Sequence, residues 1–217
     1  MPFTNPDTNE ETRYRDLKLA PQKKFVIKIL CDKFGLSQDN SKLIYEFYTY
    51  LIRRNVGDNK IADIPGIGKL KKKYSSYKRG YFVYLVAKLE IKKIINRLLD
   101  NDIARYKYYN RSKGDLQLVA TVLGVEKVIV RDMFITIAWA IVECLLRDYY
   151  FKFTRFGILY IRQVKYVNSG GITKGIGNKY YKIARTRRVY FKQINNITRK
   201  LETARLSRIM KMVKKND

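Results

Sequence analysis

The stretch Tyr149–Ile161, YYFKFTRFGILYI, decides the fold of this chain. Its first part predicts a short strand, and Phe156-Gly157 predicts a tight corner. After the corner, apolar and polar residues alternate, which is typical of a strand that has one face against a core. The stretch therefore predicts two strands joined by a glycine corner.

Helices are predicted on both sides of this stretch. Upstream, residues 115–147 predict a short helix, a break at Gly124 and a long helix, whose apolar residues share one face: Val130, Phe134, Ile137, Ile141 and Leu145. Downstream, Asn178–Lys192 predicts a returning strand, and Gln193–Lys215 predicts a final helix. The predicted order is helix, helix, three strands, helix.

The first half of the chain repeats this order. A helix from Pro21 breaks at Gly35, Ser37 is the expected N-cap of a second helix, and a strand corner follows at Gly68. A strand and a helix are then predicted at Tyr81–Val86 and Lys88–Leu99.

The spacing of matched glycines supports the repeat. Gly68 and Gly157 lie 89 positions apart, and so do Gly35 and Gly124. Such self-similarity at a fixed period predicts two copies of one α+β fold. We expect a flexible N-terminal arm at 1–20, a first copy at 21–100, a linker at 101–114 and a second copy at 115–217 with a β-arm and an extended C-terminal helix.

The second copy resembles the HU/IHF family of DNA-bending proteins over about Asp115–Leu201. The features that carry the resemblance are the element order, the Leu-Gly-Val start of the long helix, Phe-Gly at the first hairpin corner, and an Arg-x-x-x-Phe-Lys end to the third strand. HU/IHF proteins work as dimers whose intertwined subunits make one body and two β-arms. The resemblance implies that two tandem HU/IHF-like copies build that body within one chain.

The arms depart from the family pattern. HU/IHF arms end in Arg-Asn-Pro, and the proline wedges between base pairs. Here the first arm is truncated to about a dozen residues after Gly68, and the second, Gln163–Tyr181, has the tip Asn168-Ser169-Gly170-Gly171. No proline occurs after Pro65. The second arm either binds phosphates without kinking the duplex or is a glycine-rich loop ordered by a protein neighbour.

The net charge of +27 and the pI of about 10.0 make a polyanion the default partner. Surface lysine that reflects only AT-rich coding is the alternative explanation. The hypothesised nucleic-acid contacts are Arg162, Lys165, Lys174, Lys179, Lys182, Arg185, Arg187 and Arg188. The 18 tyrosines exceed what strands need, so a protein interface is also expected. Its hypothesised members are Tyr106, Tyr108, Tyr109, Tyr166, Tyr180 and Tyr181.

The composition argues against an enzyme. The chain has no histidine, and its two cysteines, Cys31 and Cys144, are expected to be core residues of a protein in a reducing compartment. No pair of carboxylates suggests acid–base chemistry, so no catalytic residue, metal or cofactor is expected. The N-terminus has no secretion signal, and Met133–Leu146 is too short to cross a membrane.

Two functions remain. One is an HU/IHF-like protein that bends or compacts double-stranded DNA. The other is a structural protein, because the chain also resembles the IHF-subunit-like virion proteins of crAss-like bacteriophages. That resemblance implies a ring or collar subunit in the portal–tail region, the head–tail connector. It also implies production in the host cytoplasm, with other virion proteins and copies of itself as partners, double-stranded DNA against the basic face, and no membrane. We favour the second function.

Overall fold

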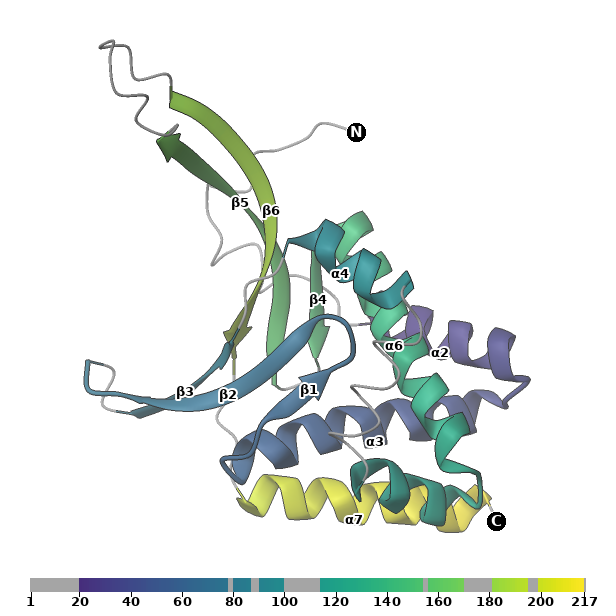
Figure 1. Ribbon diagram of the computed structural model, residues 1–217. Coiled ribbons are helices and arrows are strands. Elements are labelled where there is room, and N and C mark those ends of the chain that lie inside the picture. Colours follow the sequence, from purple (N-terminus) through teal and green to yellow (C-terminus); the bar gives the residue numbers. More distant parts are fainter. Residues whose placement is uncertain are drawn as a thin grey trace.

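The computed structural model describes residues 20–77, 80–86, 90–99, 114–153, 156–169, 181–194 and 199–216. Helices and two three-stranded antiparallel sheets make up these residues, which confirms the α+β class (Figure 1). The expected N-terminal arm lies outside the described residues except for Ala20, and the expected linker does so except for Gly114.

Both halves have the same order of elements. The first half consists of α2 (Ala20–Phe34), α3 (Gln38–Gly57), β1 (Ala62–Ile64), β2 (Gly68–Ser75), β3 (Gly80–Leu85) and α4 (Ile91–Leu99). The second consists of a helix over 114–123, α6 (Lys127–Asp148), β4 (Tyr150–Phe153), β5 (Gly157–Ser169), β6 (Tyr181–Gln193) and α7 (Arg199–Asn216). The strand orders are β1-β2-β3 and β4-β5-β6.

Two expected helix starts differ from the structure. The final helix was expected from Gln193, but β6 runs through Gln193 and α7 begins at Arg199. Gln193 pairs with Gly157 in the ladder, so strand pairing extends further than the sequence pattern indicates. The helix expected from Lys88 is described from Ile91 onward, as α4.

Glycines break the helices at matched positions. Gly35 and Gly124 have φ values of 63° and 64°, in the left-handed region that only glycine adopts without steric cost. The next helix begins three residues later in each half. Ser37 is the N-cap of α3, as predicted, because its hydroxyl accepts a hydrogen bond from the Asn40 N–H at 3.2 Å.

The strand corners also match. The Ile67 N–H donates to the Ile64 carbonyl at 3.1 Å, and the Phe156 N–H donates to the Phe153 carbonyl at 3.1 Å. All four side chains are buried. Both corners are therefore closed by the same hydrogen bond, and their buried side chains anchor each sheet in the core.

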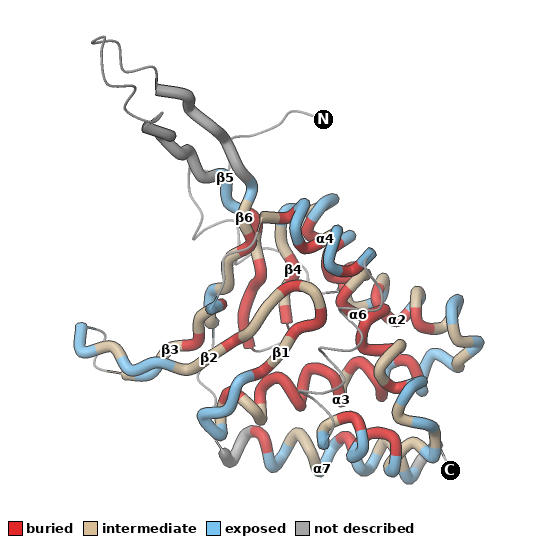
Figure 2. The backbone as a smooth tube through the Cα atoms, in the orientation of Figure 1, coloured by how far each residue is buried: buried red, intermediate tan, exposed pale blue. Residues whose placement is uncertain are grey.

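The two halves share one hydrophobic core (Figure 2). Helix α2 packs on α6, and α7 from the second half packs along α3 from the first. A buried ion pair lies in the second of these contacts: the Arg53 Nε donates to Glu202 Oε1 at 2.7 Å, and the two residues are 4% and 8% exposed. Arg53 also lies over the Phe156 ring, 5.7 Å from its centre.

Glutamines from one half satisfy the sheet edges of the other. Gln22 of α2 donates to the Tyr150 carbonyl at 2.9 Å and accepts from the Lys152 N–H at 3.1 Å, so its amide imitates a neighbouring strand at β4. Gln193 of β6 accepts from the Val83 N–H of β3 at 2.7 Å. These bonds help to join the two sheets and the helical layer into one body.

Candidate nucleic-acid interface

The hypothesised basic residues lie along the β5–β6 hairpin. Strand register places Arg162 opposite Arg188 and Lys165 opposite Arg185, while Lys182 lies opposite Asn168. Lys174 and Lys179 lie outside the described residues. The strand register therefore brings the backbones of four of the eight together as two cross-strand pairs.

The two faces of the β4-β5-β6 sheet differ. One face carries the buried side chains of Phe151, Leu159, Ile161 and Val189 and belongs to the core. The alternation of side chains puts Arg162 and Arg188 on the opposite, outer face. The same alternation puts Arg187 on the core side of the sheet, but past the last buried residue of β6, so its side chain is exposed. Its guanidinium lies 5.8 Å from the centre of the Tyr149 ring.

Tyrosines form a row across this outer face. Tyr150 pairs with Tyr160, and Tyr160 pairs with Tyr190, so the three lie side by side on adjacent strands. The rings of Tyr160 and Tyr190 stack with centres 5.7 Å apart and planes inclined by 25°. Burial, followed by the charge of Asp148, raises the pKa of Tyr150, so its hydroxyl is a neutral hydrogen-bonding group at pH 7.

Cations flank the tyrosine row. Arg162 and Arg188 lie on one side of it, and Lys152 and Lys192 lie on the other, on either side of the buried Ile158. The backbone of Glu90 forms an isolated antiparallel β-bridge with Arg188 of β6, so one negatively charged residue lies in this region. Nucleic-acid-binding surfaces commonly combine cations, which bind phosphates, with aromatic rings, on which bases or sugars stack.

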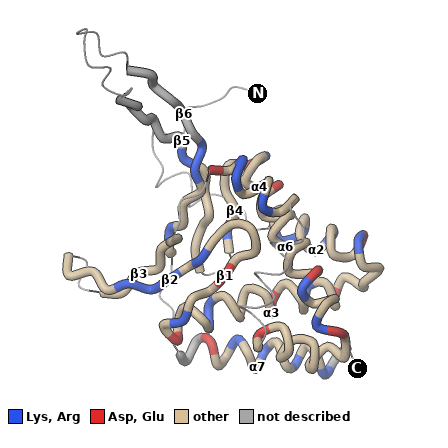
Figure 3. The backbone as a smooth tube through the Cα atoms, viewed as in Figure 1, with Lys and Arg blue, Asp and Glu red and all other residues tan. Residues whose placement is uncertain are grey.

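The outer face of the β1-β2-β3 sheet has the same character. Lys71 lies opposite Tyr84 and Lys73 opposite Phe82, and the rings of Phe82 and Tyr84 have centres 5.9 Å apart. Figure 3 shows lysine and arginine along β2 and at the base of the β5–β6 hairpin. Lysine and aromatic side chains therefore line the outer faces of both sheets.

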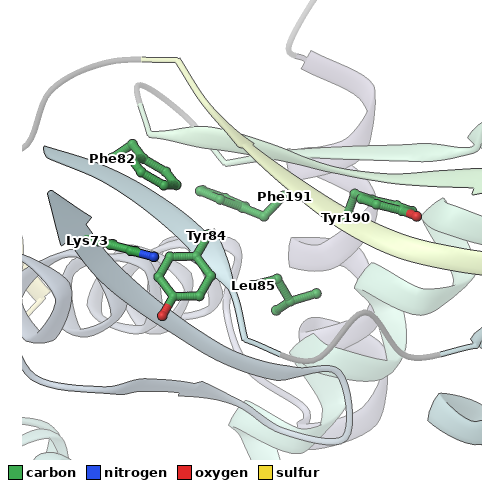
Figure 4. A pocket seen from close by; sticks show the side chains of 6 residues that line it. All are labelled: Lys73, Phe82, Tyr84, Leu85, Tyr190 and Phe191. Carbon is green, nitrogen blue, oxygen red and sulfur yellow. The ribbon is translucent and has the colours of Figure 1, made fainter. Parts of the chain in front are cut away.

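An open cavity of about 320 Å³ lies where the two sheets meet, between β3 and β6 (Figure 4). It is lined by Lys73, Phe82, Tyr84, Leu85, Tyr190 and Phe191. Lys73 is the one charged member of this lining. Its lining combines Tyr190 from the outer face of one sheet and Lys73, Phe82 and Tyr84 from that of the other with Leu85 and Phe191 from the core faces.

Sequence reasoning missed most of this surface. The cations and rings on β2, β3 and β4, and Tyr160 and Tyr190, were not among the hypothesised contacts. Strand alternation within the run KLKKKY, Lys69–Tyr74, was the available signal. Assigning that run to a face required the register of β2 against β3.

Few of the hypothesised interface tyrosines can be placed. Tyr106, Tyr108, Tyr109 and Tyr180 lie outside the described residues. The backbones of Tyr166 and Tyr181 belong to β5 and β6, opposite Ala184 and Ser169. The most exposed aromatic side chains of the described chain lie instead on the β2–β3 hairpin: Tyr74, Tyr77 and Tyr81.

Two other kinds of site are absent from the described part of the chain. Among those residues, no cluster of three or more His, Cys, Asp or Glu side chains could hold a metal ion. No helix in the same residues has both the length and the apolar character needed to span a bilayer.

The chain was compared with protein-family models, curated proteins and solved structures, and no match was found. Its function must therefore be inferred from its own residues.

Proposed function

We propose that the chain is a tandem HU/IHF-like protein that serves as a non-enzymatic structural subunit of a tailed-phage virion. Its place is a ring or collar in the portal–tail region, the head–tail connector. One observation carries the proposal: two halves with matched elements fold around one core, so a single chain completes the body. The two β-hairpins, rather than a dimer interface, are then the elements that project toward partners (Figure 1).

Matched details support the tandem duplication. The glycine breaks recur at a spacing of 89 residues with nearly the same φ, and the strand corners recur at that spacing with the same hydrogen bond. The packing of α7 from one half on α3 from the other, with the buried Arg53–Glu202 pair, interlocks the halves as intertwined subunits do. These features favour an HU/IHF-like pseudo-dimer.

The hairpins favour assembly over bending. No proline follows Pro65, so neither hairpin carries the wedge that benders of this family insert between base pairs. The strands of the first hairpin have 8 and 6 residues, against 13 and 13 in the second, so the two would not embrace a duplex equally. Exposed tyrosines on the first hairpin suit a protein neighbour.

Electron microscopy of the purified chain tests this proposal. Negatively stained particles should include closed rings of one size, because a subunit of a collar closes on itself at sufficient concentration. The chain should be imaged over a range of protein concentrations, with and without a short duplex. Monomeric particles at every concentration would contradict the proposal.

DNA binding is the second candidate, because cations and aromatic rings line the outer faces of both sheets. Replacing Arg162 and Arg188 with Ala should weaken duplex binding and reduce its salt dependence, since a protein that neutralises fewer phosphates releases fewer counterions when it binds. Arg147→Ala/Lys28→Ala is the matched control, because both residues are exposed and lie on helices. Equal weakening in both double variants would show that net charge, not this face, drives binding.

A further inference from the structure

The β2–β3 hairpin presents a preformed aromatic patch. Tyr74, Tyr77 and Tyr81 are 54%, 94% and 60% exposed. The rings of Tyr74 and Tyr81 contact edge to face with centres 5.3 Å apart, and the Lys72 ammonium lies 4.6 Å from the centre of the Tyr81 ring. Neighbouring side chains therefore hold part of the patch in position, which lowers the entropic cost of binding a partner.

The patch has a strongly basic setting. No Asp or Glu occurs between Asp63 and Glu90, and β2 alone contributes four lysines: Lys69, Lys71, Lys72 and Lys73. Half-exposed Lys72 lies on the same face of the hairpin as Tyr74 and Tyr81, whereas half-exposed Lys71 and exposed Lys73 lie on its other face. An acidic partner with apolar or proline residues would complement this patch in both charge and shape.

The chain itself contains such a segment. Residues 1–12, MPFTNPDTNEET, hold Asp7, Glu10 and Glu11 and no lysine or arginine, in a chain whose net charge is +27. The segment contains Pro2 and Pro6, and proline segments are a type of ligand that aromatic surfaces bind. Phe3 adds an aromatic side chain for the tyrosines to contact.

The position of α2 favours a hairpin on another copy. Gln22 holds the start of α2 against β4, whereas the β2–β3 hairpin projects from the body away from α2 (Figure 1). Residues 13–19 join the acidic segment to α2, and seven extended residues span at most about 25 Å. This limited reach applies to the chain's own hairpin, whereas assembly can bring the hairpin of a neighbouring copy to the arm.

We propose that residues 1–12 of one copy bind the β2–β3 hairpin of a neighbouring copy. The acidic side chains pair with the β2 lysines, and Pro2, Phe3 and Pro6 pack on the tyrosines. The proposal rests on the proposed function, because it requires copies side by side in an assembly. It supplies the linkage between them: one surface donates an arm and a different surface receives it, so the contact is head-to-tail, the type that forms a ring when the rotation between copies closes.

A charge exchange in the full-length chain tests the linkage. The arm variant is Asp7→Lys/Glu10→Lys/Glu11→Lys, and the hairpin variant is Lys71→Glu/Lys72→Glu/Lys73→Glu. In either variant alone, arm and hairpin carry the same sign of charge. In an equimolar mixture, the basic arm of one variant meets the acidic hairpin of the other, and opposite signs face each other again at that contact. Sedimentation velocity measures self-association, and circular dichroism checks folding.

Each variant alone should self-associate at least about tenfold more weakly than wild type, equivalent to about 1.4 kcal/mol. The mixture should recover to within about threefold of wild type. A control with Lys28→Glu/Lys92→Glu/Lys93→Glu, which reverses three exposed lysines on α2 and α4, should associate like wild type.

Other outcomes overturn the proposal. If both variants assemble like wild type, the arm contact fails while the ring function stands. If both are weak and the mixture does not recover, the charges act within one copy or on another surface. If the hairpin variant keeps self-association but loses duplex binding, the hairpin contacts nucleic acid instead. A wild-type chain that stays monomeric at all concentrations contradicts the ring function itself.

Discussion

The two halves of the chain agree inside the body and differ outside it. Inside, the corners Ile64–Ile67 and Phe153–Phe156 form the same hydrogen bond and are equally buried. Outside, the β2–β3 ladder ends at Ser75 and Gly80, whereas the β5–β6 ladder continues for 13 residue pairs. Positions that share a core are constrained by their neighbours, whereas a hairpin beyond the core is constrained mainly by its partner.

The halves also differ in how they fill the core. Phe151, Phe153, Phe156 and Phe191 of the second half form a chain of ring contacts with centres 5.1 to 6.1 Å apart. The matching corner of the first half is aliphatic, with Ile64, Ile67 and Leu70 fully buried. The repeat therefore preserves the backbone corner while the side chains that fill it change in size.

Separating the halves should have the largest effect. Arg53→Ala removes the positive partner of the buried Arg53–Glu202 ion pair. The buried Glu202 carboxylate then loses the guanidinium that balances its charge. We expect the free energy of unfolding to fall by about 3–5 kcal/mol, measured by urea denaturation. Arg53→Met with Glu202→Leu should recover much of this loss, because the uncompensated charge is gone. A loss no greater than that of Arg147→Ala, in an exposed pair with Asp148, would contradict the interlock.

The second strand corner should lose stability when Gly157 is replaced by even the smallest side chain. A methyl group at Gly157 would overlap the Phe191 ring and lie 2.7 Å from the Lys192 carbonyl oxygen. Because a backbone atom must move, Gly157→Ala should cost about 1–3 kcal/mol of unfolding free energy. Thermal denaturation followed by circular dichroism measures the change. An unaffected melting temperature would show that β5 and β6 separate freely at this corner.

The matched helix breaks give a smaller and paired effect. A methyl group at Gly35 or Gly124 would meet no atom within 4 Å, but both residues have positive φ. Gly35→Ala and Gly124→Ala should each cost about 1–2 kcal/mol, and the two values should agree to within about 0.5 kcal/mol. Urea denaturation of the two variants side by side provides the comparison. Clearly unequal costs would mean that the halves do not share this turn.

The smallest expected effect is a loss of stability in acid through the Glu46 carboxyl group of α3. Burial opposes ionisation of Glu46, but the Lys23 hydrogen bond and the charge of Arg205 outweigh it, so the pKa of this carboxyl lies below its ordinary value of 4.5. A lowered folded pKa contributes stability that is present above pH 4.5 and is lost as pH falls through the folded value. Glu46→Gln should therefore flatten the pH dependence of unfolding as the pH falls below 4.5. Parallel curves for variant and wild type would contradict this role.

The sequence predicted the local features well because neighbouring residues determine them. The Ser37 cap, the glycine breaks and the order of the elements all follow from short patterns. The predicted end of the third strand, at Lys192, was wrong because Gln193 still belongs to β6 through its pairing with Gly157. That pairing joins residues far apart in the chain, which no local pattern reports.

The candidate surface was harder to predict for the same reason. Arg162 and Arg188 were chosen for their charge, and only the register of β5 against β6 shows that they lie opposite one another. The tyrosine row spans three strands, so it is invisible in any one of them. The cavity between β3 and β6 forms only because these two strands, from different halves of the chain, lie in contact.

Native mass tests the central claim most directly. Sedimentation of the purified 25.7 kDa chain should be measured over a range of concentrations, at low and moderate salt, with and without a short duplex. The ring proposal predicts a single large species at a fixed multiple of the chain mass, with no dependence on duplex. A stable 25.7 kDa monomer that binds duplex, and loses that affinity steeply as salt rises, would contradict it and favour DNA binding as the function.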